Sequence, residues 1–138
     1  MKIHLLAYVA TLVVLVGVDF VWLGRMGDAV YRPIMGDMAL AGFRAVPGIV
    51  FYLIYVAGVV YFAVSPALAG GGAGAAALNG AILGLCAYGT YDLTNQATLK
   101  NWSTTLSAID MGWGTVLTAA SATIASTSSI SMRDWPRA

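Results

Sequence analysis

The stretch IHLLAYVATLVVLVGVDFVWL, residues 3–23, decides the fold of this chain. A helix needs roughly 20 predominantly apolar residues to cross the hydrocarbon core of a bilayer, and this stretch is long enough and contains a single acidic side chain, Asp19. A cleaved signal peptide has a shorter apolar core, of about 7–15 residues, followed by a small-residue cleavage site. The length of the stretch, together with Asp19 and Trp22, therefore predicts a retained transmembrane helix.

Three more apolar stretches follow, over residues 46–65, 73–95 and 106–126. Pro47 opens the first of them and Pro66 follows it, and proline is compatible with a helix start and with the chain just beyond a helix end. The apolar runs are continuous, whereas the strands of a membrane barrel alternate between apolar and polar residues. We therefore predict an all-α integral membrane four-helix bundle that forms one transmembrane domain, residues 1–126.

The composition agrees with a lipid environment. Hydrophobic residues make up 59% of the chain and charged residues 9%, against about 25% charged residues in ordinary soluble domains. A net charge of +1 without runs of lysine or arginine excludes a nucleic-acid partner. The single cysteine, Cys86, has no partner residues with the spacing of a metal site, so neither a metal nor a cofactor is expected.

Two segments lie outside the predicted spans. Residues 24–45 mix charged and apolar side chains, and they form either an amphipathic helix at the membrane interface or an ordinary polar loop. Residues 127–138 are rich in serine and are predicted to be a mobile polar tail. Basic side chains are divided almost evenly between the two sides of the membrane, so the positive-inside rule does not decide the orientation.

Three aspartates are the most informative polar residues: Asp19, Asp92 and Asp110. An acid costs roughly 2.5–3.5 kcal/mol at the bilayer centre and usually indicates function. Each of these residues lies near one end of its predicted span, and the alternating directions of the helices bring all three to the same side of the membrane. Two interpretations stay open. The carboxylates form one shared polar site, or each separately meets interfacial water or caps a helix.

Aromatic and amide side chains accompany these acids. Tyr88, Asp92 and Asn95 share one helix face, while Trp22 and Trp113 each follow an aspartate by three residues. Tyr52 and Tyr55 lie at a similar predicted depth, although any single aromatic residue also fits the ordinary belt at the membrane interface. The residues selected as candidates for ligand binding are Asp19, Trp22, Tyr88, Tyr91, Asp92, Asn95, Lys100, Asp110 and Trp113.

Small residues indicate how the helices pack. Ala76, Gly80 and Gly84 recur every four residues, which allows another helix to approach closely. We expect this stripe to serve packing inside the bundle rather than dimerisation.

Three functions fit these residues. The first is binding or transport of a cation, a proton or a small amphipathic ligand at the aspartate-lined pocket, with transport needing a homo-oligomer because four helices make a thin wall. The second is an accessory or structural membrane subunit whose acids pair internally with Arg25, Arg32, Arg44 or Lys100. The third is a lipid-modifying membrane enzyme. No nucleophile with an adjacent base is evident, so catalytic residues are not assigned and enzymatic activity is left open.

Four segments carry a resemblance to a known family. They are VDFVWLG (18–24), FYLIYVAGVVYF (51–62), AYGTYDLTNQATLKNW (87–102) and IDMGWGTVL (109–117). Together they resemble a bacterial membrane protein family known as domain of unknown function 2177, over residues 3–125. The resemblance implies a small multi-pass protein of the bacterial cytoplasmic (inner) membrane, and it implies no reaction or substrate.

Overall fold

A computed structural model describes residues 2–134 of the chain. Every regular element in this range is helical, which confirms the predicted all-α class. The elements are α1 (Lys2–Met26), η1 (Gly27–Tyr31), α2 (Arg32–Met35), η2 (Gly36–Met38), α3 (Ala45–Val59), η3 (Val60–Val64), η4 (Ala67–Gly71), α4 (Gly72–Thr98) and α5 (Thr104–Asp134).

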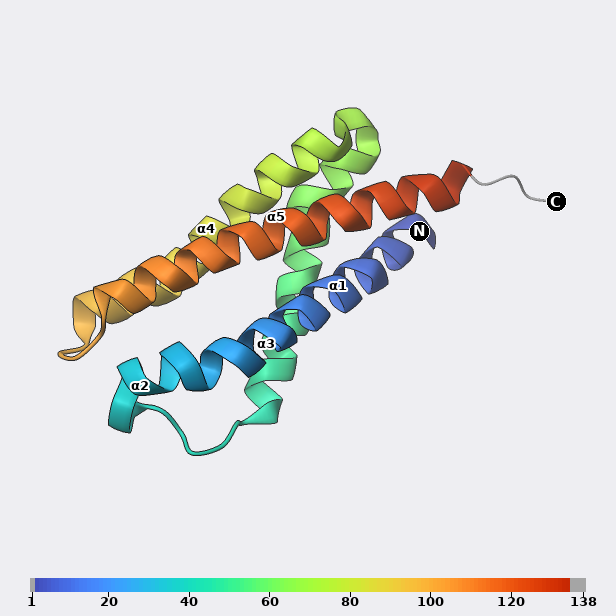
Figure 1. Cartoon of the computed structure of the whole chain (residues 1–138). Helices are drawn as coiled ribbons and strands as arrows, with labels where there is room; N and C mark the ends of the chain where they lie inside the picture. Colours follow the sequence, from blue (N-terminus) through green and yellow to red (C-terminus); the bar gives the residue numbers. More distant parts are fainter. Residues whose placement is uncertain (1, 135–138) are drawn as a thin grey trace.

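Helix α5 is at the centre of the packing. It contacts α4 along most of their shared length and contacts α1 on another side, and Figure 1 shows these three long helices running in similar directions. The segment formed by α3 and η3 crosses them at a steep angle. The beginning of α1 and the end of α5 lie at one end of the molecule, while the turn from α1 into α2 and the α4–α5 connection lie at the opposite end (Figure 1). We call this opposite end the loop end.

Glycine allows α4 and α5 to approach closely. A Cβ atom added to Gly80 would lie 2.9 Å from the carbonyl oxygen of Thr118, and one added to Gly84 would lie 2.8 Å from the Thr118 hydroxyl and closer still to the Gly114 carbonyl oxygen. Ala76 is fully buried in the same stripe. The predicted role of these small residues in packing within the chain is therefore confirmed.

The helix that begins with α3 does not end before Pro66, as the sequence analysis expected. It passes through the proline with a π-helical turn, η3, on its N-terminal side. Proline lacks an N–H group and its ring crowds the preceding turn, and a π turn re-routes the local hydrogen bonds. The Ser65 hydroxyl donates a 2.8 Å hydrogen bond to the carbonyl of Val60. The chain turns at Gly70, whose φ of 117° favours glycine.

The connection between α1 and α3 is partly helical and partly irregular. Residues 27–38 are helical, in η1, α2 and η2, and residues 39–44 form an irregular loop. At the other end of the chain, α5 continues to Asp134, so the segment expected to be a mobile tail from Thr127 is helical over its first part. Residues 135–138 lie outside the described residues.

Within residues 2–134, two helical runs are long and apolar enough to cross a membrane, Lys2–Met38 and Ala45–Thr98, and the second is interrupted by the turn at Gly70. Large apolar side chains project outward from several helices, among them Leu5, Phe20, Ile54, Tyr61, Phe62, Leu78 and Val116. Helix α5 does not meet the same criterion, because it is rich in serine and threonine. Several of these hydroxyl groups face inward: Thr118, Ser121, Ser126 and Ser129 are fully buried.

Candidate functional site

Asp19 on α1 forms hydrogen bonds with two other helices near the loop end. Its carboxylate accepts a 2.5 Å hydrogen bond from the Tyr52 hydroxyl of α3 and a 2.8 Å hydrogen bond from the Trp113 indole of α5. One donor reaches each carboxylate oxygen, and the residue is 5% exposed. Asp19 is therefore held as a buried acceptor by two neutral donors.

Asp110 on α5 is held from the connection between α1 and α3. The Tyr31 hydroxyl donates a 2.5 Å hydrogen bond to Oδ1 of Asp110, and the Tyr31 oxygen in turn accepts a 3.1 Å hydrogen bond from the Trp22 indole. Burial, and then the hydrogen bond to Asp110, raise the pKa of the Tyr31 phenol, so the phenol stays protonated and serves as the donor.

An aromatic stack joins these two acid sites. The rings of Trp22 and Trp113 are parallel within 5°, with their centroids 4.0 Å apart. Trp113 donates to Asp19, and Trp22 donates to the phenol that holds Asp110. A displacement of either indole would therefore affect both carboxylates.

Asp92 on α4 has a different environment. It is fully buried, and neither of its carboxyl oxygens has a hydrogen-bond partner among the described residues. Its polar neighbours are the Asp110 carboxyl and the Ser107 hydroxyl. A buried carboxylate without donors costs several kcal/mol, so the neutral acid is the form that suits this position.

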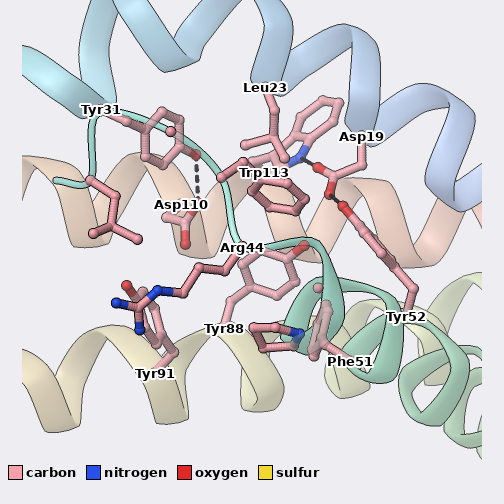
Figure 2. A pocket seen from close by; sticks show the side chains of 15 residues that line it. Asp19, Leu23, Tyr31, Arg44, Phe51, Tyr52, Tyr88, Tyr91, Asp110 and Trp113 are labelled. Atoms are coloured by element: carbon pink, nitrogen blue, oxygen red, sulfur yellow. Dashed lines mark hydrogen bonds between the residues drawn. The ribbon is translucent and has the colours of Figure 1, made fainter.

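A cavity of about 600 Å³ opens beside Asp19 and Asp110, and we call it the aspartate cavity (Figure 2). Its walls are largely aromatic, and its charged side chains are the two aspartates and Arg44. Arg44 forms no ion pair with an acid among residues 2–132, where the ion pair found joins Arg32 to Asp28 at 3.0 Å. The lining residues are Asp19, Leu23, Tyr31, Leu40, Gly42, Phe43, Arg44, Pro47, Gly48, Phe51, Tyr52, Tyr88, Tyr91, Asp110 and Trp113.

The structure brings together some of the residues selected from the sequence and separates others. Those that line the aspartate cavity are Asp19, Tyr88, Tyr91, Asp110 and Trp113. Trp22 lies outside it and stacks on Trp113. Asp92, Asn95 and Lys100 do not line it. Asp92 shares a helix face with Tyr88, but it is fully buried, and Lys100 is exposed in the connection between α4 and α5.

Asp110 does not cap the start of its helix, which was one of the interpretations left open. The first turn of α5 is capped by the Ser103 hydroxyl, which accepts a 3.3 Å hydrogen bond from the amide of Leu106. Asp110 lies further along α5 and faces the Tyr31 phenol instead. Its role is therefore tertiary and not that of a local cap.

Three further polar side chains of the cavity, those of Tyr31, Arg44 and Tyr52, were not among those selected. Tyr52 was noted only for its predicted depth, and Arg44 only as one of the basic residues that could pair with the acids. Tyr31 lies in a connecting segment without periodicity. A useful signal for Tyr31 is its position beside Arg32 in a segment of mixed charged and apolar residues, near the predicted level of the aspartates. This signal places the residue at the loop end but does not select its partner.

Comparisons with known proteins agree with this membrane assignment. The model of a family described as a predicted membrane protein (DUF2177) matches residues 4–127. Searches of curated proteins and of solved structures found no match. The family match covers nearly all of the helical part, including every lining residue of the aspartate cavity. The chain therefore belongs to the DUF2177 family of predicted membrane proteins.

Proposed function

We propose that this chain is a multi-pass membrane protein that binds a small amphipathic ligand, cationic at its polar end, in the aspartate cavity. In this proposal α1, α3 with η3, α4 and α5 are four membrane spans, and residues 27–38 lie at the interface. The bacterial inner membrane is part of this proposal, and the resemblance described above supports it. The residues proposed to contact the ligand are Asp19, Tyr88, Tyr91, Asp110 and Trp113, with Trp22 and Asp92 supporting them.

One observation carries this proposal. Two carboxylates border a cavity with aromatic walls, and neither forms an ion pair with lysine or arginine within residues 2–132. Aromatic faces and carboxylates both attract an ammonium group, and the attraction is stronger where water is excluded. The cavity volume of about 600 Å³ falls within the range of known small-molecule sites.

The other two functions have less support. An accessory subunit with internally paired charges would join these acids to basic side chains, but Asp19 and Asp110 accept hydrogen bonds from phenols and an indole. A bare metal cation needs several free oxygen ligands, and both oxygens of Asp19 are already acceptors. No arrangement of nucleophile and base in the cavity favours a lipid-modifying reaction.

Replacing Asp110 with asparagine is expected to weaken binding of octyltrimethylammonium at least tenfold, which corresponds to about 1.4 kcal/mol. The substitution removes the charge but keeps an oxygen that can accept from Tyr31. Isothermal titration of the purified protein in a maltoside detergent measures the affinity, and uncharged octyl glucoside supplies the background.

Asp28→Asn is the matched control, because Asp28 is exposed, pairs with Arg32 and does not line the cavity. Its affinity for octyltrimethylammonium should equal that of the native protein. Equal affinities in all three proteins, or no heat above the octyl glucoside background in the native protein, would contradict the proposed function.

A further inference from the structure

An apolar groove lies between α1 and α3, next to the aspartate cavity. It has a volume of about 500 Å³, and its lining is apolar apart from the Tyr52 hydroxyl. Tyr52 also lines the aspartate cavity, so this one ring borders both spaces. We call the second space the α1–α3 groove. Its lining residues are Leu12, Val13, Val16, Gly17, Ile49, Tyr52 and Leu53.

Glycine keeps part of this groove open. A Cβ atom added to Gly17 would meet no other atom within 4 Å, whereas glycines at the α4–α5 contact leave no such room. Gly17 is exposed whereas Asp19, two residues later, is buried, so the two spaces meet at Tyr52 and not along α1. An occupant that extended from the aspartate cavity past Tyr52 would therefore meet an apolar surface.

The aspartate cavity carries charges of both signs that do not neutralise each other. Asp19 and Asp110 both line it, together with the rings of Tyr52, Tyr88 and Trp113, and Figure 2 shows the two acids at separate places in the wall. Arg44, at the start of α3, also lines the cavity, but it forms no ion pair with either acid. Figure 2 shows the Arg44 side chain extended below Asp110 and away from Asp19. A ligand with a single charge would pair either with the carboxylates or with the guanidinium, and would leave the other without a partner.

We infer that the ligand is a zwitterionic lipid, held with its ammonium group at the aspartates and aromatic rings, its anionic group at Arg44 and a hydrocarbon chain in the α1–α3 groove. This inference rests on the proposed function and names the class of ligand. An ammonium group is attracted by carboxylates and aromatic faces, and a phosphate or carboxylate by a guanidinium. The apolar groove keeps the attached hydrocarbon chain out of water while the headgroup is bound.

The test uses three probes of equal chain length: a single-chain phosphocholine lipid, an alkyltrimethylammonium and an alkyl phosphate. Native mass spectrometry of the purified protein in maltoside micelles measures the fraction of protein that carries one probe molecule. The phosphocholine lipid should bind at least tenfold more tightly than either singly charged probe. Arg44→Gln should remove its advantage over the ammonium probe, and the ammonium probe itself should bind no more weakly, because the variant removes a positive charge from the same cavity.

Gly17→Phe should weaken the binding of all three probes at least fivefold, because the phenylalanine ring fills the α1–α3 groove. Gly24→Phe is its matched control, because Gly24 lies on the same helix in open space and lines neither space. Thermal unfolding must show both variants folded, and Gly17→Leu replaces Gly17→Phe if the latter does not fold.

The outcomes separate this inference from the proposed function. Equal binding of the phosphocholine and ammonium probes would overturn the zwitterionic assignment and leave the cationic-ligand proposal standing. If the alkyl phosphate bound most tightly, or if no probe bound above the micelle background, both the zwitterionic assignment and the cationic-ligand proposal would be overturned. A Gly17→Phe variant that bound the phosphocholine lipid as well as Gly24→Phe does would overturn the placement of the chain.

Discussion

Replacing Gly84 with leucine is expected to destabilise the folded chain by about 3 kcal/mol or more, because overpacking a close helix contact forces the backbones apart. The first side-chain atom at this position would already overlap the carbonyl of Gly114 and the side chain of Thr118. Neither is the free end of a flexible side chain, so α4 and α5 must separate. Unfolding in increasing sodium dodecyl sulfate, followed by circular dichroism, measures the loss.

Gly112→Leu is the control for this prediction. Gly112 lies on α5, and a Cβ atom added there would meet nothing within 4 Å. Leucine also has a better helix propensity than glycine, so this variant should be at least as stable as the native chain. If Gly84→Leu unfolded at the same detergent fraction as Gly112→Leu, the close approach of α4 and α5 at this point would be wrong.

Replacing Asp19 with alanine is expected to lower the free energy of unfolding by about 3 kcal/mol, because two half-buried hydrogen-bond donors lose their acceptor at once. The Tyr52 hydroxyl and the Trp113 indole both donate to this carboxylate, and they belong to α3 and α5. The loss therefore loosens the contact of α1 with two other helices. Asp19→Asn should cost less, since it keeps one acceptor oxygen. The same detergent titration compares the two variants.

A double variant distinguishes this explanation from a simple loss of side-chain volume. Adding Tyr52→Phe to Asp19→Ala removes one of the orphaned donors, so the pair should be more stable than the sum of the two single losses predicts. Asp37→Ala, at an exposed position, should leave stability unchanged. Strict additivity of the Asp19 and Tyr52 changes would show that the hydrogen bond between them does not form.

The helical class and the approximate extent of the long helices could be predicted because very few backbone structures are stable in lipid. A long apolar chain must satisfy its backbone groups internally, and a helix does this without partners. The common level of Asp19 and Asp110 followed from the alternating directions of successive helices, and the structure places both on one cavity. The stripe of Ala76, Gly80 and Gly84 was recognisable because small residues every four positions occupy one helix face.

Other features depend on tertiary contacts that a single sequence does not contain. Spacing puts Asp92 on the same helix face as Tyr88, but only the packing of the helices decides that Tyr88 reaches the cavity while Asp92 is fully buried. Tyr31 reaches Asp110 across 79 positions of sequence, from a segment without periodicity. The helix continues past Pro66 because a π turn accommodates the proline, and such a turn has no distinct sequence pattern.

Photolabelling tests the central claim most directly, namely that the aspartates and aromatic rings form one ligand site. An alkylammonium probe with a photoreactive diazirine beside its nitrogen is irradiated with the protein in maltoside micelles, and the labelled peptides are mapped by mass spectrometry. We predict labelling of residues around Tyr88, Asp110 and Trp113 that excess octyltrimethylammonium suppresses. The claim of a single ligand site would be contradicted if the label spread over the outward-facing Phe20, Ile54 and Phe62 and the competitor did not reduce it.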